Sequence, residues 1–334
     1  MAANAPSEPV FFNAAAIDSC LNFSMLRDCL TQAFAGSLIS PPRQHYGLGD
    51  ATQLLMPSWS VDAPAQGSFL GTKVVSVHPH NGQNGLATVQ GLFFLQDGET
   101  GLPLAVMDAA RLTLWRTAAT SALAASYLAR QDAATLLMVG AGQLAPFLVR
   151  AHQDVRPLRR VLLWNRSRDA AAQLATSLRN SWRGAPQPAL SVVDDLPAAV
   201  AEADVISCAT LSRTPLIRAA WLKAGVHLDL VGAFAPGMRE VDDDTLRAAR
   251  IFLDTQAACT EGGDVAEGLK AGVISTKSLA GVLADLCLKH IVGRERAGEI
   301  TLFKSIGAAI EDLAAAVMVW QAWSARGAGQ SERK

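Results

Sequence analysis

Long hydrophobic runs are absent from this sequence, so no segment is predicted to span a membrane. The best candidate, around residues 308–323, is interrupted by the acidic residues Glu311 and Asp312. The N-terminal stretch has no basic region followed by an apolar core, so we expect no secretory signal and a cytoplasmic protein. The 334 residues carry a formal net charge of −1, without the basic bias of a nucleic-acid-binding protein. We therefore expect neither a membrane nor a nucleic acid as a partner.

Paired cysteines and zinc-binding histidine motifs are also absent. The five cysteines are scattered and form no C-x-x-C pair, so we expect buried thiols in a reducing compartment. The six histidines include no H-E-x-x-H motif. His78 and His80 form a possible pair, but no third ligand lies nearby in the sequence. The sequence therefore predicts no metal site.

The strongest motif present is a glycine-rich turn that follows a short apolar run. Residues 136–139 lead into Gly140, Gly142 and Ala145, with the spacing G-x-G-x-x-A. This pattern is typical of a buried parallel strand, a tight turn and a helix that together bind a dinucleotide pyrophosphate. Gly140 forms the turn, Gly142 lets the backbone approach the ligand, and Ala145 allows close packing of helix and strand. The residues predicted to surround the pyrophosphate are Gly140, Gly142, Gln143 and Leu144.

Arginines stand where many such proteins carry an acidic residue, at the end of the second strand. A NAD-binding protein usually has Asp or Glu there to bind the ribose 2′-hydroxyl, whereas this sequence reads Asn165-Arg166-Ser167-Arg168. Arginine and serine donors suit a 2′-phosphate. We therefore predict NADPH as the cofactor and keep NADH as the less favoured alternative. The competing interpretation is that Arg166 and Arg168 form a solvated loop end.

Short apolar strands alternate with helices in the middle of the chain, which predicts a Rossmann-type, doubly wound parallel sheet. The strands are expected at 135–139, 161–164, 204–208, 227–231 and 251–254, with helices near 143–153 and 168–180. The first 110 or so residues instead predict a helix near 24–35 and a meander of mostly antiparallel strands, with a hairpin turn at Asp97-Gly98.

The last segment, residues 305–323, predicts one long helix that returns to the first domain. The expected fold is therefore α/β, with the parallel sheet inserted in a smaller α+β domain. The expected boundaries are 1–115 for a substrate-binding and dimerisation domain, 116–303 for an NADP-binding domain, and 304–334 for the returning helix.

Three basic residues lie on otherwise apolar elements or beside prolines in the first part of the chain. Lys73 lies in a predicted strand, Arg116 in a predicted helix, and Arg43 in a loop after two prolines. No carboxylate is close to them in the sequence. If they converge, they suit a ligand that carries a carboxylate, which arginine binds through two parallel hydrogen bonds. Considered singly, each has a structural alternative, a strand-edge lysine that prevents aggregation or a surface arginine on a helix.

Several segments, in order from about residue 40 to 315, together resemble the ornithine cyclodeaminase/mu-crystallin family. The matching segments are 71–81, 85–89, 114–119, 139–142, 231–233, 236–240 and 301–313. The resemblance implies a homodimer, in which the N-terminal strands and the last helix form the substrate and dimerisation domain. It implies that Arg43, Lys73 and Arg116 hold the substrate carboxylate and that Thr88 lines the pocket. We also assign Thr210, Val231 and Gly232 to the cofactor site, whereas Asn81 and Ser305 match the family without a role.

One position departs from the cyclodeaminase pattern. Cyclodeaminases of this family have an aspartate just after the V-G-A segment and before P-G, and here Phe234 takes that place. Phenylalanine cannot accept a proton, so the resemblance points instead to the ketimine reductases, which include the Δ1-pyrroline-2-carboxylate reductases. The expected reaction is NADPH-dependent reduction of Δ1-pyrroline-2-carboxylate to L-proline, and of Δ1-piperideine-2-carboxylate to L-pipecolate, with the substrate bound between the domains.

In this reaction, hydride passes from C4 of NADPH to C2 of the imine, and either Lys73 or an ordered water protonates the nitrogen. Glu311 and Asp312 are expected to be structural, to close the pocket, or to be solvated charges. Alternative functions are an ornithine cyclodeaminase, an alanine-dehydrogenase-like amino-acid oxidoreductase, an opine-type reductase, or a non-catalytic, crystallin-like NADPH-binding protein.

Overall fold

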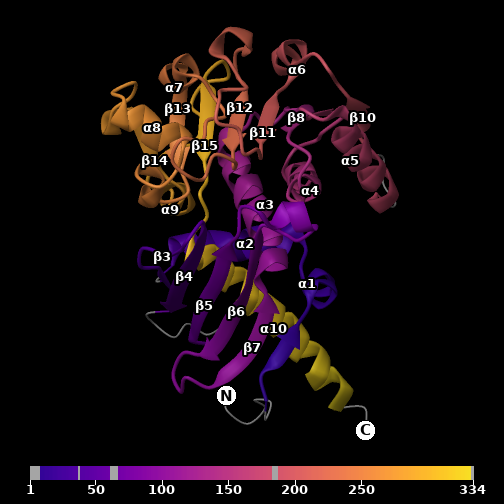
Figure 1. Cartoon of the computed structure of the whole chain (residues 1–334), viewed down its shortest axis with the longest axis vertical. Helices are drawn as coiled ribbons and strands as arrows, with labels where there is room; N and C mark the ends of the chain where they lie inside the picture. The colour runs from indigo at the N-terminus through magenta and orange to yellow at the C-terminus, as the bar shows by residue number, and fades with distance from the viewer. Residues whose placement is uncertain (1–7, 37, 61–66, 183–186, 332–334) are drawn as a thin grey trace. The chain divides into compact units, whose positions relative to one another are not determined.

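The computed structural model describes residues 8–36, 38–60, 67–182 and 187–331. The chain forms two compact units, which Figure 1 shows with their elements labelled. The first unit combines Met1–Thr117 with Ala308–Lys334, and the second unit is Ala118–Gly307. The expected domain boundaries, after residues 115 and 303, lie two and four residues from these divisions. Each unit is built around its own sheet, so the predicted α/β architecture is confirmed.

The first unit contains a seven-stranded sheet in the order β1-β7-β6-β5-β4-β2, with β3 paired to β4. Every neighbouring pair is antiparallel except β1 with β7. The strands are β1 (Val10–Phe12), β2 (Leu38–Ile39), β3 (Gln44–Leu48), β4 (Ala51–Ser60), β5 (Phe69–Val77), β6 (Val89–Asp97) and β7 (Pro103–Asp108). The expected β6–β7 hairpin is present, and the Asp97 carboxylate accepts the N–H groups of Glu99 and Thr100 in its turn.

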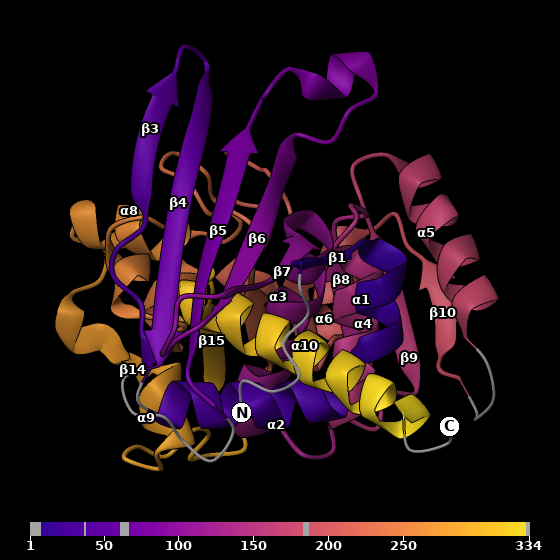
Figure 2. The ribbon, with the colours of Figure 1, turned by 90° about the horizontal axis from the view of Figure 1, so that it is seen from below.

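One face of this sheet packs against the last helix. The helices of the first unit are α1 (Ala14–Cys20), α2 (Phe23–Ala35), the start of α3 (Ala109–Leu128) and α10 (Ala309–Ser331), with a short 3-10 helix, η2 (Asn81–Asn84). Helix α10 packs on β4, β5 and β6 and also contacts α1 and α2. Figure 2 shows α10, in yellow, running across the strands beside α2. The sheet therefore has one covered face.

Four strands of this sheet, β1 to β4, were not predicted from the sequence, and β3 and β4 show why. All five residues of β3 are exposed, so the strand lacks the alternation of apolar and polar residues that signals a half-buried strand. Strand β4 contains Pro57, and a proline within an apolar run argues against a strand. Both strands form because each pairs along its length with a neighbour.

The second unit contains an eight-stranded sheet in the order β10-β9-β8-β11-β12-β15-β13-β14, and every pairing is parallel. The strands are β8 (Thr135–Val139), β9 (Arg160–Trp164), β10 (Ala189–Val192), β11 (Val205–Cys208), β12 (His227–Leu230), β13 (Ala249–Leu253), β14 (Leu279–Val282) and β15 (Ile300–Lys304). The order of β8 to β12 is that of a dinucleotide-binding sheet, with its topological switch between β8 and β11.

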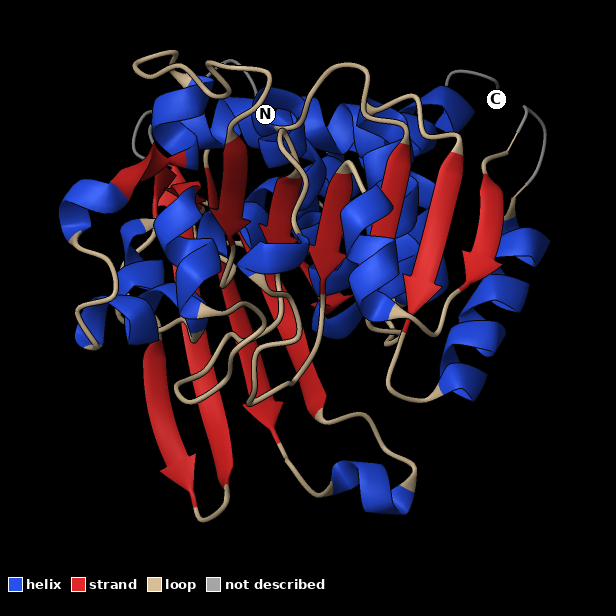
Figure 3. Ribbon diagram, turned by 90° about the horizontal axis from the view of Figure 1, so that it is seen from above, coloured by secondary structure: helices blue, strands red, loops and turns tan. Residues whose placement is uncertain are grey.

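Helices cover the strands of the second unit, as Figure 3 shows in blue in front of and behind the red strands. The α-helices are the rest of α3, α4 (Ala145–Val155), α5 (Arg168–Ser181), α6 (Leu196–Glu202), α7 (Asp243–Ala248), α8 (Asp264–Lys270) and α9 (Leu283–Cys287). The 3-10 helices are η3 (Ala219–Trp221), η4 (Gln256–Cys259) and η5 (Thr276–Ser278). Among the helices that the structure describes, none is long and apolar enough to cross a membrane.

The last helix begins four residues later than predicted, at Ala309 rather than at residue 305. Strand β15, which the sequence analysis missed, ends at Lys304, and a turn follows in which Gly307 has a φ of 78°. The buried carboxylate of Asp254 accepts the N–H groups of Ile306 and Gly307, both at 2.7 Å. These two bonds hold the backbone at residues 306 and 307 in a turn, so the helix begins only after them.

Candidate functional site

A buried network of two cations and two carboxylates lies within the first unit. Lys73 Nζ is 2.6 Å from Asp312 Oδ2. Arg116 Nε donates to Asp312 Oδ1 at 3.0 Å, and its Nη1 donates to Glu311 Oε2 at 2.7 Å. Lys73 is 3% exposed, Arg116 5%, and both carboxylates 0%. Asp312 therefore links Lys73 and Arg116, which are 43 positions apart in the sequence.

Strand and helix geometry explain how these side chains meet. Residues 71, 73 and 75 share the buried face of β5, because side chains alternate between the faces of a strand. Gly71 leaves room on that face, since a Cβ there would overlap Phe93 and lie 3.0 Å from Leu313. Glu311 and Asp312 lie in the first turn of α10, where the helix dipole favours negative charge.

The surroundings change the pKa of both cations. Burial lowers the pKa of Lys73, Asp312 raises it, and the charges of Arg116 and Arg43 lower it, so that it falls to about 8. Burial lowers the pKa of Arg116 as well, but Asp312 and Glu311 together raise it above its ordinary value. Arg116 is therefore a fixed positive charge, whereas Lys73 is able to hold or release a proton near neutral pH.

The structure brings together Lys73 and Arg116, and the charge of Arg43 acts on Lys73 from the loop before β3. Thr88 lies apart from them. It is exposed, directly before β6, and is five residues from Phe93, the cross-strand partner of Lys73. Five strand residues span about 17 Å. The role assigned to Thr88 by the resemblance stays a prediction.

The sequence analysis left several roles open for the two carboxylates and favoured a structural one. One expectation made Glu311 and Asp312 solvated charges, and this was wrong, because both are fully buried and paired. The sequence around Lys73 contains no nearby carboxylate, so it did not reveal that Asp312 lies beside Lys73 in the structure. A usable signal was present, since adjacent acidic residues in an otherwise apolar helix are seldom buried unless they are paired.

The second unit presents an open backbone turn after β8. Gly140 has a φ of 113°, and a Cβ there would lie 2.6 Å from the carbonyl oxygen of Ala209. Gly142 is exposed, and no described atom lies within 4 Å of where its Cβ would be. Within the described ranges, the backbone N–H groups of Gly142, Gln143 and Leu144 have no acceptor, and Leu144 makes no side-chain cap for α4. Such a helix start is suited to binding a phosphate.

The two arginines after β9 differ in their surroundings. Arg168 pairs with Asp194, and both side chains are exposed. Arg166 is exposed and has no hydrogen bond or ion pair with any residue that the structure describes. Ser167 caps α5 by accepting the N–H of Ala170 at 3.3 Å, and Asn165 donates to the Ser167 carbonyl at 3.0 Å. Arg166 is therefore the more available of the two cations, while Asn165 and Ser167 shape the turn.

The remaining predicted cofactor residues lie after β11 and β12, at the carboxyl ends of neighbouring parallel strands. Thr210 donates its N–H and its hydroxyl to Glu240 Oε1, each at 2.8 Å. The N–H groups of Val231 and Gly232 both donate to the carbonyl of Cys208, at 2.9 and 3.1 Å. Ligands of doubly wound sheets bind at this edge, so the positions of Thr210, Val231 and Gly232 are compatible with a cofactor site.

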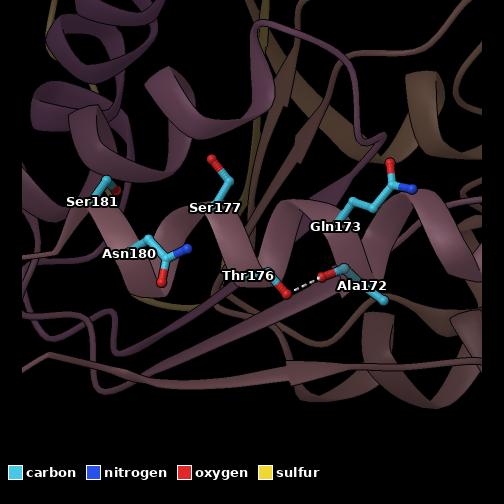
Figure 4. A pocket seen from close by; sticks show the side chains of 6 residues that line it. All are labelled: Ala172, Gln173, Thr176, Ser177, Asn180 and Ser181. Atoms are coloured by element: carbon cyan, nitrogen blue, oxygen red, sulfur yellow. Dashed lines mark hydrogen bonds between the residues drawn. The ribbon is translucent and has the colours of Figure 1, made fainter.

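A shallow hollow on the exposed side of α5 carries no such chemistry. Figure 4 shows its lining, with the Thr176 hydroxyl donating to the Ala172 carbonyl at 3.0 Å. The six lining residues, none of them titratable, are Ala172, Gln173, Thr176, Ser177, Asn180 and Ser181. No group of three or more potential metal ligands occurs in the described part of the chain. Each unit therefore carries its own candidate site, the charged network in the first unit and the strand ends in the second.

Known proteins resemble this chain along nearly its whole length. The model of the ornithine cyclodeaminase/mu-crystallin family matches residues 11–327. The Δ1-pyrroline-2-carboxylate reductase of Colwellia psychrerythraea is 36% identical over 307 residues, which cover 89% of this chain and 93% of the relative.

Two solved structures share the fold. One is the Δ1-pyrroline-2-carboxylate reductase of Thermococcus litoralis in complex with NADH and L-proline, with a TM-score of 0.89, 28% identity, and coverage of 95% of this chain and 98% of that one. The other is an archaeal alanine dehydrogenase dimer with bound NAD, with a TM-score of 0.87, 28% identity, and coverage of 96% and 97%. The chain belongs to the ornithine cyclodeaminase/mu-crystallin family.

Proposed function

We propose that this protein is an oxidoreductase that uses NADPH to reduce cyclic ketimine acids. The substrates are Δ1-pyrroline-2-carboxylate, giving L-proline, and Δ1-piperideine-2-carboxylate, giving L-pipecolate. The observation that carries this proposal is the buried pair of Lys73 and Asp312 beside Arg116, which joins a proton donor to a carboxylate-binding cation. The names of the relatives support an enzyme that acts on carbon–nitrogen double bonds.

The substrate carboxylate is held by the basic residues of the first unit. Lys73 and Arg116 are balanced by Asp312 and Glu311, so the buried network has no net charge, and Arg43 is a further cation whose charge acts on Lys73. The two hydrogen bonds described for Arg116 use two of the five N–H donors of a guanidinium. Its planar geometry suits a carboxylate bound through two parallel hydrogen bonds.

Lys73 supplies the proton in this mechanism. NADPH, when bound, would supply the hydride for C2 of the imine. Lys73 would donate its ammonium proton to the ring nitrogen as the C=N bond becomes a C–N bond. The pKa of Lys73, about 8, keeps it mainly protonated at neutral pH yet lets it lose the proton more readily than an ordinary lysine. Asp312 orients the ammonium through the 2.6 Å bond.

The preference for NADPH over NADH is part of the proposal and rests on Arg166. Its exposed guanidinium follows β9, where a dinucleotide-binding sheet meets the adenosine ribose. No acidic side chain stands in that turn, which reads Asn165-Arg166-Ser167-Arg168. A solved relative is described with NADH, so the two nucleotides have to be compared directly.

The outer face of the first unit's sheet supports a homodimer. The register places Leu92 and Phe94 of β6 on the same face as Tyr46 and Leu48 of β3, opposite the face that carries Lys73. All four apolar side chains are between 38% and 52% exposed, and exposed apolar patches usually mark an interface. We propose that a second copy of this chain covers them, as the alanine dehydrogenase relative is a dimer.

Sedimentation of a Phe94→Glu variant tests the dimer. A charge on this face is expected to shift the protein towards the monomer, because it would be buried without a partner at the interface. Val292→Glu is the matched control, since Val292 is 63% exposed and lies in the second unit. A Phe94→Glu variant that sediments like the unmodified protein would place the interface elsewhere.

Turnover assays test the proposed reaction. The purified protein is mixed with NADPH and Δ1-pyrroline-2-carboxylate, and oxidation of NADPH is followed by its absorbance. L-Ornithine with NAD⁺, and pyruvate with ammonia and NADH, are run in parallel for the cyclodeaminase and alanine dehydrogenase alternatives. We expect rapid oxidation of NADPH with the imine, and no turnover in the two parallel assays. Ammonia release from ornithine would contradict the proposal, and nucleotide binding without turnover would indicate a binding protein.

A further inference from the structure

A second buried charge network lies in the second unit and has no part in the proposed chemistry. It consists of Lys304 at the end of β15, Asp264 at the start of α8, and Glu240 between β12 and α7, each 0% exposed. Lys304 Nζ lies 3.6 Å from Asp264 Oδ2. One buried lysine therefore faces two buried carboxylates. Charges are rarely buried without a function or a partner, so we expect these three side chains to hold other groups in place.

Each member of the network holds a piece of backbone at the carboxyl edge of the sheet. Lys304 Nζ donates to the carbonyl of Gly232, after β12. Glu240 Oε1 accepts the N–H and hydroxyl of Thr210, after β11, both at 2.8 Å. Asp264 Oδ1 accepts the N–H of Glu240 at 2.7 Å and thereby fixes the carboxylate that holds Thr210. The network thus joins the two segments that were assigned to the cofactor.

The backbone around Glu240 is packed too tightly to adopt another shape without losing these contacts. A Cβ on Gly232 would overlap the Glu240 carboxylate and the Thr210 backbone. Ala233 has a φ of 47°, a region that alanine rarely adopts. The Ala233 carbonyl accepts the N–H of Gly263 at 2.6 Å, directly before α8. The left-handed Ala233 is therefore held by its backbone bonds to Thr210 and Gly263, and the Glu240 carboxylate packs against its neighbour Gly232.

Two oxygens of this network lack a donor. Glu240 Oε2 and Asp264 Oδ2 are buried and have no hydrogen-bond partner among the described residues. Burial raises the pKa of Glu240, Lys304 lowers it, Asp264 raises it and the two hydrogen bonds from Thr210 lower it, so that it lies at about 7. The titratable and charged groups around Glu240 are Lys304 from β15, Asp264 from α8, Cys208 from β11, and Arg239, whose Nε is 3.8 Å from Asp264. A proton on Glu240 removes one of two unfavourably buried negative charges.

We propose that Lys304 and Glu240 are positioning residues that hold the Thr210 and Gly232 segments in the shape that receives the nicotinamide end of the cofactor. This inference rests on the proposed function, because it requires that the protein bind a nicotinamide nucleotide. Ionised Glu240 is the stronger acceptor for the N–H and hydroxyl of Thr210 and holds that segment firmly. Protonated Glu240 accepts these two bonds more weakly, so nucleotide affinity falls as the pH falls.

Nucleotide binding by the full-length protein tests this proposal. The dissociation constant for NADPH is measured by fluorescence at a series of pH values that span about 7. Glu240→Gln keeps an oxygen acceptor for Thr210, adds an N–H₂ donor, and cannot ionise. Glu202→Gln is the matched control, because Glu202 is half exposed, pairs with Arg160, and lies in the same unit. We expect the affinity of the unmodified protein and of Glu202→Gln to rise with rising pH, and that of Glu240→Gln to stay constant.

Lys304→Met removes the donor to the Gly232 carbonyl and gives a second readout. We expect its dissociation constant for NADPH to rise by about tenfold, which corresponds to the loss of one charge-assisted hydrogen bond. At saturating NADPH, kcat is expected to change less than the KM for NADPH. A residue with only a structural role would lower the melting temperature and leave the pH dependence of binding unchanged.

The outcomes separate this inference from the proposed function. If the unmodified protein binds NADPH, and both variants bind it with unchanged affinity and pH dependence, the inference is overturned while the reductase proposal stands. If the unmodified protein binds neither NADPH nor NADH, both are overturned. If Lys304→Met does not fold, Glu240→Gln decides, because glutamine preserves the shape of the side chain.

Discussion

Each unit of this protein buries a lysine beside two carboxylates, yet the two networks differ in how completely they are paired. In the first unit, Arg116 adds a second cation, and every oxygen of Glu311 and Asp312 has a donor. In the second unit, one oxygen of Glu240 has no donor among the described residues. The group whose pKa is shifted towards neutrality is a base in the first network, Lys73, and an acid in the second, Glu240.

The difference shows why a buried lysine does not identify a catalytic lysine. Lys73 lies beside Arg116 and within reach of the charge of Arg43, so its proton is available to an anionic ligand held by these groups. Lys304 instead donates to a backbone carbonyl within its own unit. Substitutions that affect one network and spare the other test this division, and they are expected to differ in which kinetic constant they change.

Lys73→Met is expected to have the largest effect. It removes the proposed proton donor, so kcat for imine reduction should fall by about 10²- to 10⁴-fold, the contribution that general acid catalysis usually makes. The dissociation constant for NADPH should change little, in contrast to Lys304→Met. Steady-state rates with Δ1-pyrroline-2-carboxylate and fluorescence titration with NADPH measure the two quantities. If this variant keeps its kcat, the proton donor would be an ordered water rather than Lys73.

Arg116→Lys is expected to have the next largest effect, on substrate binding. Lysine keeps the charge but loses the planar pair of donors, and a hydrogen bond between charged groups contributes about 1.5–3 kcal/mol. The KM for the imine should therefore rise by roughly 10- to 100-fold, with a smaller change in kcat. Unchanged kinetics for this variant would remove Arg116 from the substrate site.

Asp312→Asn is expected to move the pH dependence of the reaction. Asp312 raises the pKa of Lys73, so removing its charge lowers that pKa below about 8. The proton donor is then lost at lower pH, and the alkaline limb of the kcat/KM profile shifts towards acid. We expect a roughly tenfold loss of activity on the alkaline side and a smaller one on the acid side. A profile that keeps its alkaline limb would show that Lys73 does not control it.

Arg166→Ala is expected to have the smallest effect, limited to the choice of nucleotide. An exposed ion pair contributes about 0.2–1 kcal/mol, so affinity for NADPH should fall by about two- to fivefold while affinity for NADH stays the same. Arg168→Ala is the matched comparison, and its effect should be smaller because Arg168 already pairs with Asp194. Equal losses for NADPH and NADH in the Arg166 variant would argue against a 2′-phosphate contact.

Local patterns predicted five of the eight strands of the parallel sheet, because the signals of these strands lie close together in the sequence. The bounds of β8 match the predicted strand at 135–139, and Gly140, Gly142 and Ala145 follow within six residues. The pattern of apolar strand, glycine turn and helix is largely decided by local sterics and periodicity. The confirmed fold class and the family resemblance both depend on such short segments.

What escaped prediction depends on contacts between distant residues. Asp312 is 239 positions from Lys73, and Asp254 is more than 50 positions from the turn that delays α10. The two arginines after β9 look equivalent in the sequence, and only Asp194, 26 positions beyond Arg168, distinguishes them. Burial, pairing and the pKa of a side chain are set by such neighbours, and one sequence alone does not reveal them.

The register of β5 against β6 assigns two different roles to alternate residues of these strands. Lys73 and Val75 point to the α10 side, whereas Leu92 and Phe94 point to the outer side that is proposed to meet a second copy. A deletion of one residue within β5 would therefore exchange the two sides beyond that point. Placed before Lys73, such a deletion would turn the ammonium of Lys73 away from Asp312 and towards the outer side. Proteins built on this sheet should therefore tolerate substitutions in these strands far more readily than insertions or deletions.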